Sequence, residues 1–168
     1  MKRLKLPCKK TAVILFSVFF FVYAADRFTK WLVLVNLELG ERAEVIPGIL
    51  RFTYQQNTGG AFSAFSQIGW LFVIAVPAAV VALILCMFFG VISHPLGIVS
   101  CVCILGGAIG NYTDRLMYGY VIDMIDVYCI HFAVFNVADC FITVGCILLG
   151  ISLFLPQKKD ETKETCGN

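Results

Sequence analysis

Four long apolar stretches, separated by polar connections, constrain what this chain of 168 residues can fold into. They cover residues 11–37, 68–92, 96–117 and 135–155, and each can cross a hydrocarbon core about 30 Å thick as a helix. Hydrophobic residues make up 60% of the sequence and charged residues 14%, with a mean hydropathy of +0.86. The sequence therefore predicts an all-α integral membrane protein with four transmembrane helices, in a single domain over residues 1–168.

Basic residues predict how these four helices are oriented. Lysines and arginines gather before the first apolar stretch and in the polar tail 157–168, and four spans place both ends on one side. The positive-inside rule then predicts cytoplasmic termini and outer loops at 38–67 and 118–134. A cleaved N-terminal signal peptide is the alternative, but apolar sequence resumes at Trp31, which favours one spanning helix. The net charge of +2 is too small to indicate a nucleic-acid partner.

The first outer loop contains several glycines and a proline, which are typical of turns rather than of a span. Within it, Leu50, Phe52 and Tyr54 alternate with polar residues, and this period of two predicts a short strand with one solvated face. A small extracytoplasmic β-sheet is therefore expected beside the four helices.

Eight cysteines are present, and most of them lie in the apolar stretches, where they are expected to serve as small apolar side chains. Cys101 and Cys103 have no second cysteine pair or histidine at the spacing of a zinc site. The sequence therefore predicts no metal site.

Polar and charged residues converge at one membrane depth. Asn111 lies sixteen residues beyond Pro95, roughly 24 Å along a helix, and Asp26 reaches a similar depth in the first span. Asn136 and Asp139 open the fourth helix from the outer side, and Asn57 lies in the first outer loop. Ionisable groups at such depths are costly and are usually functional, so we expect a site at the outer membrane interface.

Several of these residues also have a purely structural interpretation. Asn136 followed by Asp139 is typical of a helix N-cap with an acidic third residue. The remaining structural alternatives are an ion pair of Asp26 with Lys30, an ion pair of Asp114 with Arg115, and helix packing at Gly106 and Gly110.

Asp123 is harder to explain structurally. Its neighbours are Val121, Ile122, Met124 and Ile125, no basic residue lies within four positions, and Asp126 follows at the spacing of one helical turn. Such a carboxylate must be hydrogen-bonded, paired or protonated. If it faces Asp139, the two would share a proton, as in aspartic peptidases.

Four segments together resemble the lipoprotein signal peptidase (signal peptidase II) family. They are GGAIGNYTDRLMYGYVIDMID at 106–126, FNVADCFITVG at 135–145, NTGGAFS at 57–63 and DRFTK at 26–30. The resemblance implies a four-helix membrane aspartyl peptidase of the bacterial inner membrane, with its site near the extracytoplasmic face. Its substrate would be a diacylglyceryl-modified prolipoprotein, from which it removes the signal peptide.

The resemblance also implies roles for individual residues. Asp123 and Asp139 would form the catalytic pair. Four residues would bind substrate or brace the site: Asn57, Asn111, Arg115 and Asn136. Three polar residues would be structural: Asp26, Lys30 and Asp114. Phe62 and Phe65 of the first outer loop are expected to cover the acyl chains, a hypothesis from their position alone.

The mechanism expected for such a pair needs neither a metal nor another cofactor. One ionised aspartate takes a proton from a water that attacks the scissile carbonyl, and the protonated partner stabilises the carbonyl oxygen. The chain is expected to act as a monomer among membrane lipids. Two other functions use the same acids: a proton-coupled transporter and a structural membrane subunit.

Overall fold

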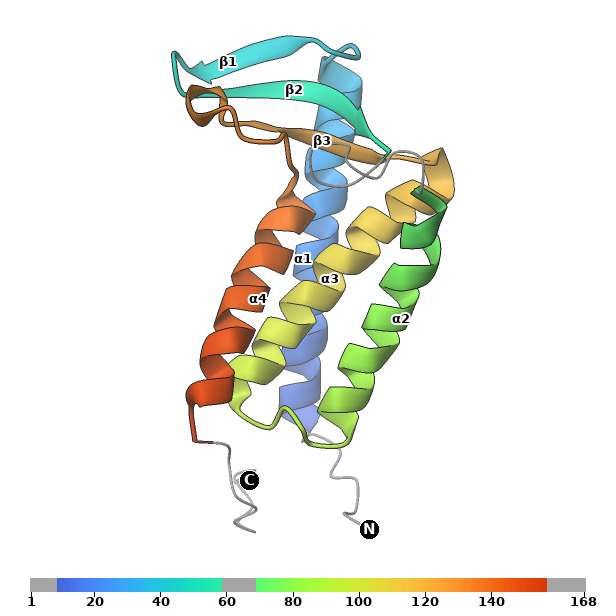
Figure 1. Ribbon diagram of the computed structural model, residues 1–168, viewed down its shortest axis with the longest axis vertical. Helices are drawn as coiled ribbons and strands as arrows, with labels where there is room; N and C mark the ends of the chain where they lie inside the picture. Colours follow the sequence, from blue (N-terminus) through green and yellow to red (C-terminus); the bar gives the residue numbers. More distant parts are fainter. Residues whose placement is uncertain (1–8, 59–68, 157–168) are drawn as a thin grey trace.

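In the computed structural model, which describes residues 9–58 and 69–156, four helices stand side by side and a small sheet covers one end of them (Figure 1). The helices are α1 (Lys9–Asn36), α2 (Gly69–Phe88), α3 (Pro95–Tyr118) and α4 (Val137–Phe154). Three of them, α1, α3 and α4, are long and apolar enough to cross a membrane. In α2 the apolar stretch with described side chains, Phe72–Phe88, is shorter. The presence of four helices is thus confirmed, with three of them at spanning length, while the tail 157–168 lies outside the described residues.

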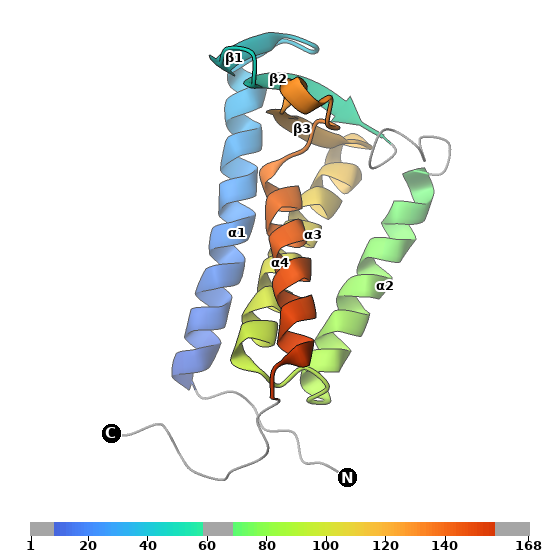
Figure 2. The ribbon, with the colours of Figure 1, turned by 60° about the vertical axis from the view of Figure 1, so that its left-hand side comes forward.

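α3 is the central helix, because it packs against each of the other three (Figures 1 and 2). Its glycines permit close approach. A Cβ on Gly106 would come within 2.9 Å of the Val22 side chain, and one on Gly110 within 2.5 Å of the Asp26 carboxylate. The predicted packing role of both glycines is confirmed, and α1 consequently lies directly against the polar part of α3.

The sheet has three antiparallel strands in the order β1 (Arg42–Ile46), β2 (Leu50–Asn57) and β3 (Val121–Asp126). β2 confirms the predicted strand, but its faces do not alternate as expected. Phe52 is exposed, whereas Thr53 and Tyr54 are both buried. The register of β2 against β3 shifts between Phe52 and Gln55, and such a bulge interrupts the alternation of faces.

β3 lies within the predicted outer loop 118–134, and it corrects the prediction that Asp123 and Asp126 lie one helical turn apart. α3 ends at Tyr118, Gly119 caps it with a left-handed φ of 80°, and the chain then enters the strand. Residues three apart in a strand point to opposite faces, so the two aspartates separate. Asp123 binds Asn57 and Asn136, whereas Asp126 pairs with Arg51. The β-branched residues of this segment favour a strand.

Under the sheet, the interior of the molecule is polar. Asp26, Lys30, Asn111, Asp114, Asp123 and Asn136 are all at most 7% exposed. An apolar cluster of Val33, Tyr54, Ile122 and Met124 packs between α1 and the sheet. The polar residues are therefore enclosed by the sheet above and the helices around them.

All six cysteines in the described residues are free thiols, and Cys129 is exposed on the short helix η3 (Tyr128–Ile130).

Candidate active site

Asp123 is held on β3 by two side-chain amides. The Nδ2 of Asn57 donates to its Oδ2 at 2.8 Å, and the Nδ2 of Asn136 donates to its Oδ1 at 2.6 Å. The residue is 2% exposed. Each carboxylate oxygen of Asp123 therefore has one fixed donor, and both donors are neutral.

Asp139 lies in the first turn of α4 and forms a capping box with Asn136. The Oδ1 of Asn136 accepts from the backbone N–H of Asp139 at 3.0 Å, and the Oδ2 of Asp139 accepts from the backbone N–H of Asn136 at 3.2 Å. A third bond joins the Nδ2 of Asn111 to the Oδ1 of Asp139 at 2.8 Å. The predicted N-cap is confirmed, and because Asn136 also binds Asp123 it contacts both aspartates.

Lys30 occupies the centre of the buried charges. Its Nζ lies 2.9 Å from Asp26 and 2.7 Å from Asp114, so the predicted pair of Asp26 with Lys30 is confirmed. The predicted pair of Asp114 with Arg115 is wrong. Asp114 instead binds Arg27 and Lys30 from α1, while the guanidinium of Arg115 lies over the ring of Phe72.

Two of these acids also fix the backbone next to the site aspartates. Asp114 accepts from the backbone N–H of Ile122 at 3.2 Å, directly before Asp123. Asp26 accepts from the backbone N–H of Ala138 at 3.1 Å, directly before Asp139. The sequence did not indicate this arrangement, nor the part played by Arg27. The only signal for Arg27 was a second charged residue beside Asp26 in an apolar helix.

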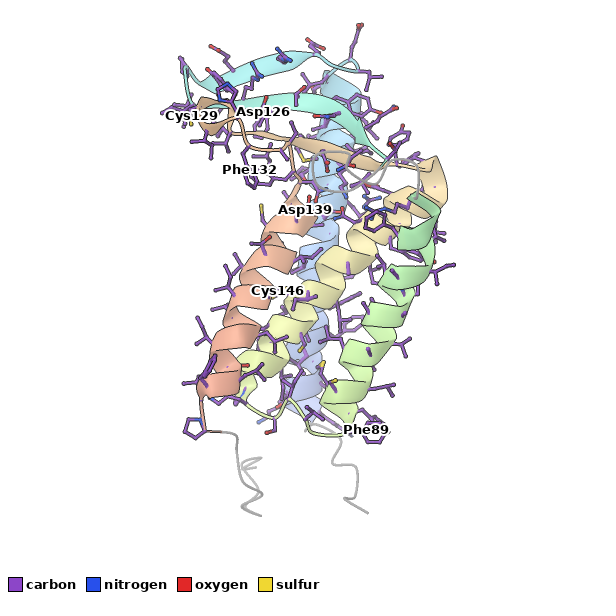
Figure 3. The ribbon with its side chains drawn as sticks, in the orientation of Figure 1. Phe89, Asp126, Cys129, Phe132, Asp139 and Cys146 are labelled. Carbon is purple, nitrogen blue, oxygen red and sulfur yellow. The ribbon has the colours of Figure 1, made fainter. Side chains whose placement is uncertain are left out.

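Both aspartates line one cavity of about 540 Å³, which lies between the sheet and the helices. It is lined by Asn57, Asn111, Arg115, Val121, Asp123, Phe132, Ala133, Val134, Phe135, Asp139, Cys140, Thr143 and Val144. Figure 3 shows Phe132 below the sheet, near Asp139 at the top of α4. Polar groups thus share the cavity with a mainly apolar wall from residues 132–135 and from α4.

Arg115 reaches this cavity from α3. Its guanidinium lies 4.8 Å from the ring centroid of Phe72, and its Nη1 approaches the backbone carbonyl of Asn111 at 3.5 Å. Asn57, Asn111, Asn136 and Arg115 therefore all lie within reach of the two aspartates. Residues 59–63 of the NTGGAFS segment, with Phe62 and Phe65, lie outside the described residues.

The electrostatic environment of Asp123 favours its protonated form. Burial raises the pKa of Asp123 from 3.8 to about 6, the bond from Asn57 opposes this, and the negative charge of Asp139 raises it further. Two neighbouring carboxyl groups with one shared proton can supply a base and an acid to the same water. Within residues 9–58 and 69–156, no group of three or more His, Cys, Asp or Glu side chains could hold a metal ion.

Comparisons with known proteins agree on one family. The sequence profile described as "Signal peptidase (SPase) II" matches residues 18–155. A "Lipoprotein signal peptidase" of Brevibacillus brevis is 35% identical over 139 residues, which are 83% of this chain and 93% of that protein. The protein of the same name from Lactobacillus johnsonii is 40% identical, over 83% of this chain and 90% of that one.

A solved structure of a bacterial membrane enzyme superposes with a TM-score of 0.80 at 29% identity, and covers 96% of this chain and 98% of its own. A second bacterial membrane enzyme gives a TM-score of 0.76 at 30% identity, over 84% of this chain and 92% of its own. These similarities extend over the helices and the sheet that together form the cavity.

Proposed function

The chain belongs to the signal peptidase II family, and on that premise we propose that Asp123 and Asp139 are the catalytic pair of a lipoprotein signal peptidase. The protein is an aspartic-type membrane endopeptidase that removes signal peptides from bacterial prolipoproteins. One observation carries the assignment of the pair. Both carboxylates line one cavity, and a single residue, Asn136, is hydrogen-bonded to both.

The pair performs general acid and base catalysis on one water molecule. The ionised aspartate accepts a proton from the water as its oxygen attacks the scissile carbonyl carbon. The protonated aspartate donates to the carbonyl oxygen as negative charge develops there. Asn57, Asn111 and Asn136 hold the carboxylates in place, and Arg115 adds positive charge to the same cavity.

The substrate is a prolipoprotein that carries a diacylglyceryl group, and it arrives by diffusion within the membrane. The apolar wall of the cavity, which includes Phe132, Val134 and Val144, suits an apolar peptide and its lipid. The enzyme acts as a monomer and one domain in the bacterial inner membrane. The sheet and the active site lie near the extracytoplasmic face, and both termini lie in the cytoplasm.

Cleavage of a purified precursor tests this function. The wild-type protein is expected to cleave the diacylglyceryl-modified precursor and to leave the unmodified precursor intact. Asp123→Asn and Asp139→Asn are each expected to lower kcat by about 10²-fold or more, because each removes a proton-transfer group. The folded fraction of each variant, measured by size-exclusion chromatography in detergent, provides the control. Substantial cleavage by either folded variant would contradict the assignment of the pair.

A proton-coupled transporter would need acids along the whole membrane path. Among the described helical residues, the acidic side chains are Asp26, Asp114 and Asp139, and hydrogen bonds and ion pairs link all three to the cluster beneath the sheet. No acid lies in the opposite half of the described helices. The arrangement therefore favours chemistry at one level over transfer across the membrane.

A further inference from the structure

The two aspartates differ in what surrounds them. Asp139 accepts a backbone N–H in the first turn of α4, where the helix macrodipole favours a negative charge. Asp123 lies on a strand, and the side-chain amides of Asn57 and Asn136 donate to it. Asp123 is also the more deeply buried, since Asp139 retains intermediate exposure on the cavity wall. An ion is therefore better accommodated at Asp139, which is also the carboxylate more accessible to water.

Lys30 increases this difference through Asn111. The Nζ of Lys30 lies 2.8 Å from the Oδ1 of Asn111, and an ammonium group can only donate. The Asn111 amide must therefore direct its oxygen to Lys30 and its Nδ2 to Asp139, which it reaches at 2.8 Å. The positive charge of Lys30, next to the Asn111 oxygen, polarises the amide group. This makes the Nδ2–H of Asn111 a stronger donor to Asp139. The charge of Lys30 also acts on Asp123, but the hydrogen-bonded chain runs from Lys30 through Asn111 to Asp139 and favours a negative charge there.

We infer that Asp139 is the ionised base of the pair, that Asp123 carries the shared proton, and that Lys30 is the positioning residue that imposes this order through Asn111. The inference rests on the proposed peptidase function. It also agrees with the raised pKa of Asp123, for which burial is the main cause.

This assignment gives a balanced reaction. A water O–H bond breaks, its proton goes to Asp139, and the water oxygen bonds to the scissile carbon. The proton of Asp123 moves to the carbonyl oxygen, so a neutral tetrahedral diol forms. Asp139 then gives its proton to the leaving nitrogen as the C–N bond breaks, and one diol hydroxyl returns its proton to Asp123. Both aspartates end in their starting state.

Other charged or titratable groups near the pair do not reverse this order. They are Asp26, Arg27 and Lys30 from α1, Asp114 and Arg115 from α3, and Cys140 from α4. Asp26, Arg27, Lys30 and Asp114 form a cluster with two charges of each sign. Arg115 interacts with both site aspartates, so it lowers the cost of a negative charge on the pair without selecting one member.

The pH dependence of kcat/KM tests the role of Lys30 with the full-length protein and a diacylglyceryl-modified precursor. Lys30→Met removes the charge and keeps much of the apolar stem. We expect the acid limb of the profile to move to higher pH by about one unit, which is about tenfold in activity on that limb. Arg42→Gln, which removes an exposed cation on β1, is the matched control and should leave the limb in place. A uniform loss at every pH with an unmoved limb would overturn the inference.

Removal of Lys30 leaves Asp26 and Asp114 with less compensation, so the single variant has a risk of misfolding. Lys30→Met combined with Asp114→Asn keeps the cluster neutral and retains an amide oxygen that can accept from the N–H of Ile122. The same shift of the acid limb is expected. If wild type does not cleave the precursor, the proposed function fails. If it cleaves and the limb does not move, only the inference fails.

Infrared spectroscopy provides a readout that does not depend on activity. The carbonyl stretch of a protonated carboxylic acid is expected in the wild-type protein below pH 6. It should be lost in Asp123→Asn and persist in Asp139→Asn, where it should disappear at a lower pH than in wild type because the charge of Asp139 is absent. A band that survives Asp123→Asn but disappears in Asp139→Asn would assign the proton to Asp139 and overturn the inference.

Discussion

The catalytic role proposed for Asp123 requires a carboxyl group, and the site around this residue disfavours the ionised form of that group. Its pKa rises from 3.8 to about 6 mainly because the residue is buried, and Asn57 and Asn136 compensate only in part. A raised carboxyl pKa means that the folded state binds the proton more tightly than the unfolded state. This contribution to stability is full below pH 3.8 and is lost as the pH rises through about 6.

Asp123→Asn should therefore stabilise the protein at pH 8 while it abolishes cleavage. The gain in free energy of unfolding is at most about 3 kcal/mol, from the difference between the two pKa values. A flip of the Asn57 amide would let its oxygen accept from the new side-chain N–H. The midpoint of thermal denaturation in detergent, measured from pH 4 to pH 8, checks this. The variant and wild type should converge near pH 4, and an equal difference at all pH values would contradict the assigned pKa.

Asp126 provides a comparison, because the same strand directs it away from the site. Its Oδ2 lies 2.6 Å from the Nε of Arg51, whose guanidinium lies 4.5 Å from the centroid of the Tyr128 ring. Asp126→Asn is expected to retain wild-type kcat and to lower the free energy of unfolding by about 1 kcal/mol, as for a partly exposed ion pair. Cleavage rate and denaturation midpoint measured on the same preparation check this. A large loss of kcat in folded protein would instead give Asp126 a catalytic role.

At the scale of elements, the contact between α3 and α4 determines where Asp139 lies. A Cβ on Gly107 would come within 2.6 Å of the backbone carbonyl of Ala138 and 2.9 Å of the Ile142 side chain. Ala138 precedes Asp139, and its N–H is bonded to Asp26. Any separation of the two helices at Gly107 therefore displaces Asp139 from Asn111 and from the cavity.

Gly107→Ala is expected to lower the free energy of unfolding by about 1–3 kcal/mol, as overpacked cores do, and to reduce kcat as well. The matched control is Gly150→Ala on α4, where an added Cβ has no atom within 4 Å. That control should be neutral or more stable by up to about 1 kcal/mol, because alanine favours a helix over glycine. Denaturation midpoints and cleavage rates of both variants check this pair of outcomes. Equal effects of the two substitutions would contradict a close helix contact at Gly107.

The sequence predicted the four helices but missed the strand β3. Apolar length alone located the four helices, because a membrane span requires a minimum number of apolar residues. β3 was missed because a strand is defined by its partners, and the partners of Ile122 and Val121 are Gln56 and Asn57 in a distant segment. The pair of Asp114 with Lys30 was missed for the same reason, since it depends on how α1 and α3 pack.

At the scale of the whole molecule, the sheet encloses one end of a helix bundle, and the cavity lies where the two meet. Lys9 at the start of α1 and Phe154 at the end of α4 lie at the opposite end of the bundle (Figures 1 and 2). A membrane around the helices therefore places the site at one interface. The start of α1 and the end of α4 lie at the other interface. The proposed orientation lets water enter the cavity from the side of the sheet, while lipid contacts the helices.

The exposed thiol of Cys129 allows this orientation to be tested. Cys129 lies on η3, at the edge of the sheet (Figure 3), whereas Cys146 lies along α4, where lipid would surround it. With the sheet outside, a membrane-impermeant maleimide added to right-side-out vesicles should label the wild-type protein, and Cys129→Ser should abolish most of this labelling. Cys129→Ser is expected to keep its cleavage activity, because Cys129 does not line the cavity. Labelling that requires inverted vesicles and still depends on Cys129 would place the sheet in the cytoplasm. That outcome would reverse the proposed orientation without affecting the assignment of Asp123 and Asp139.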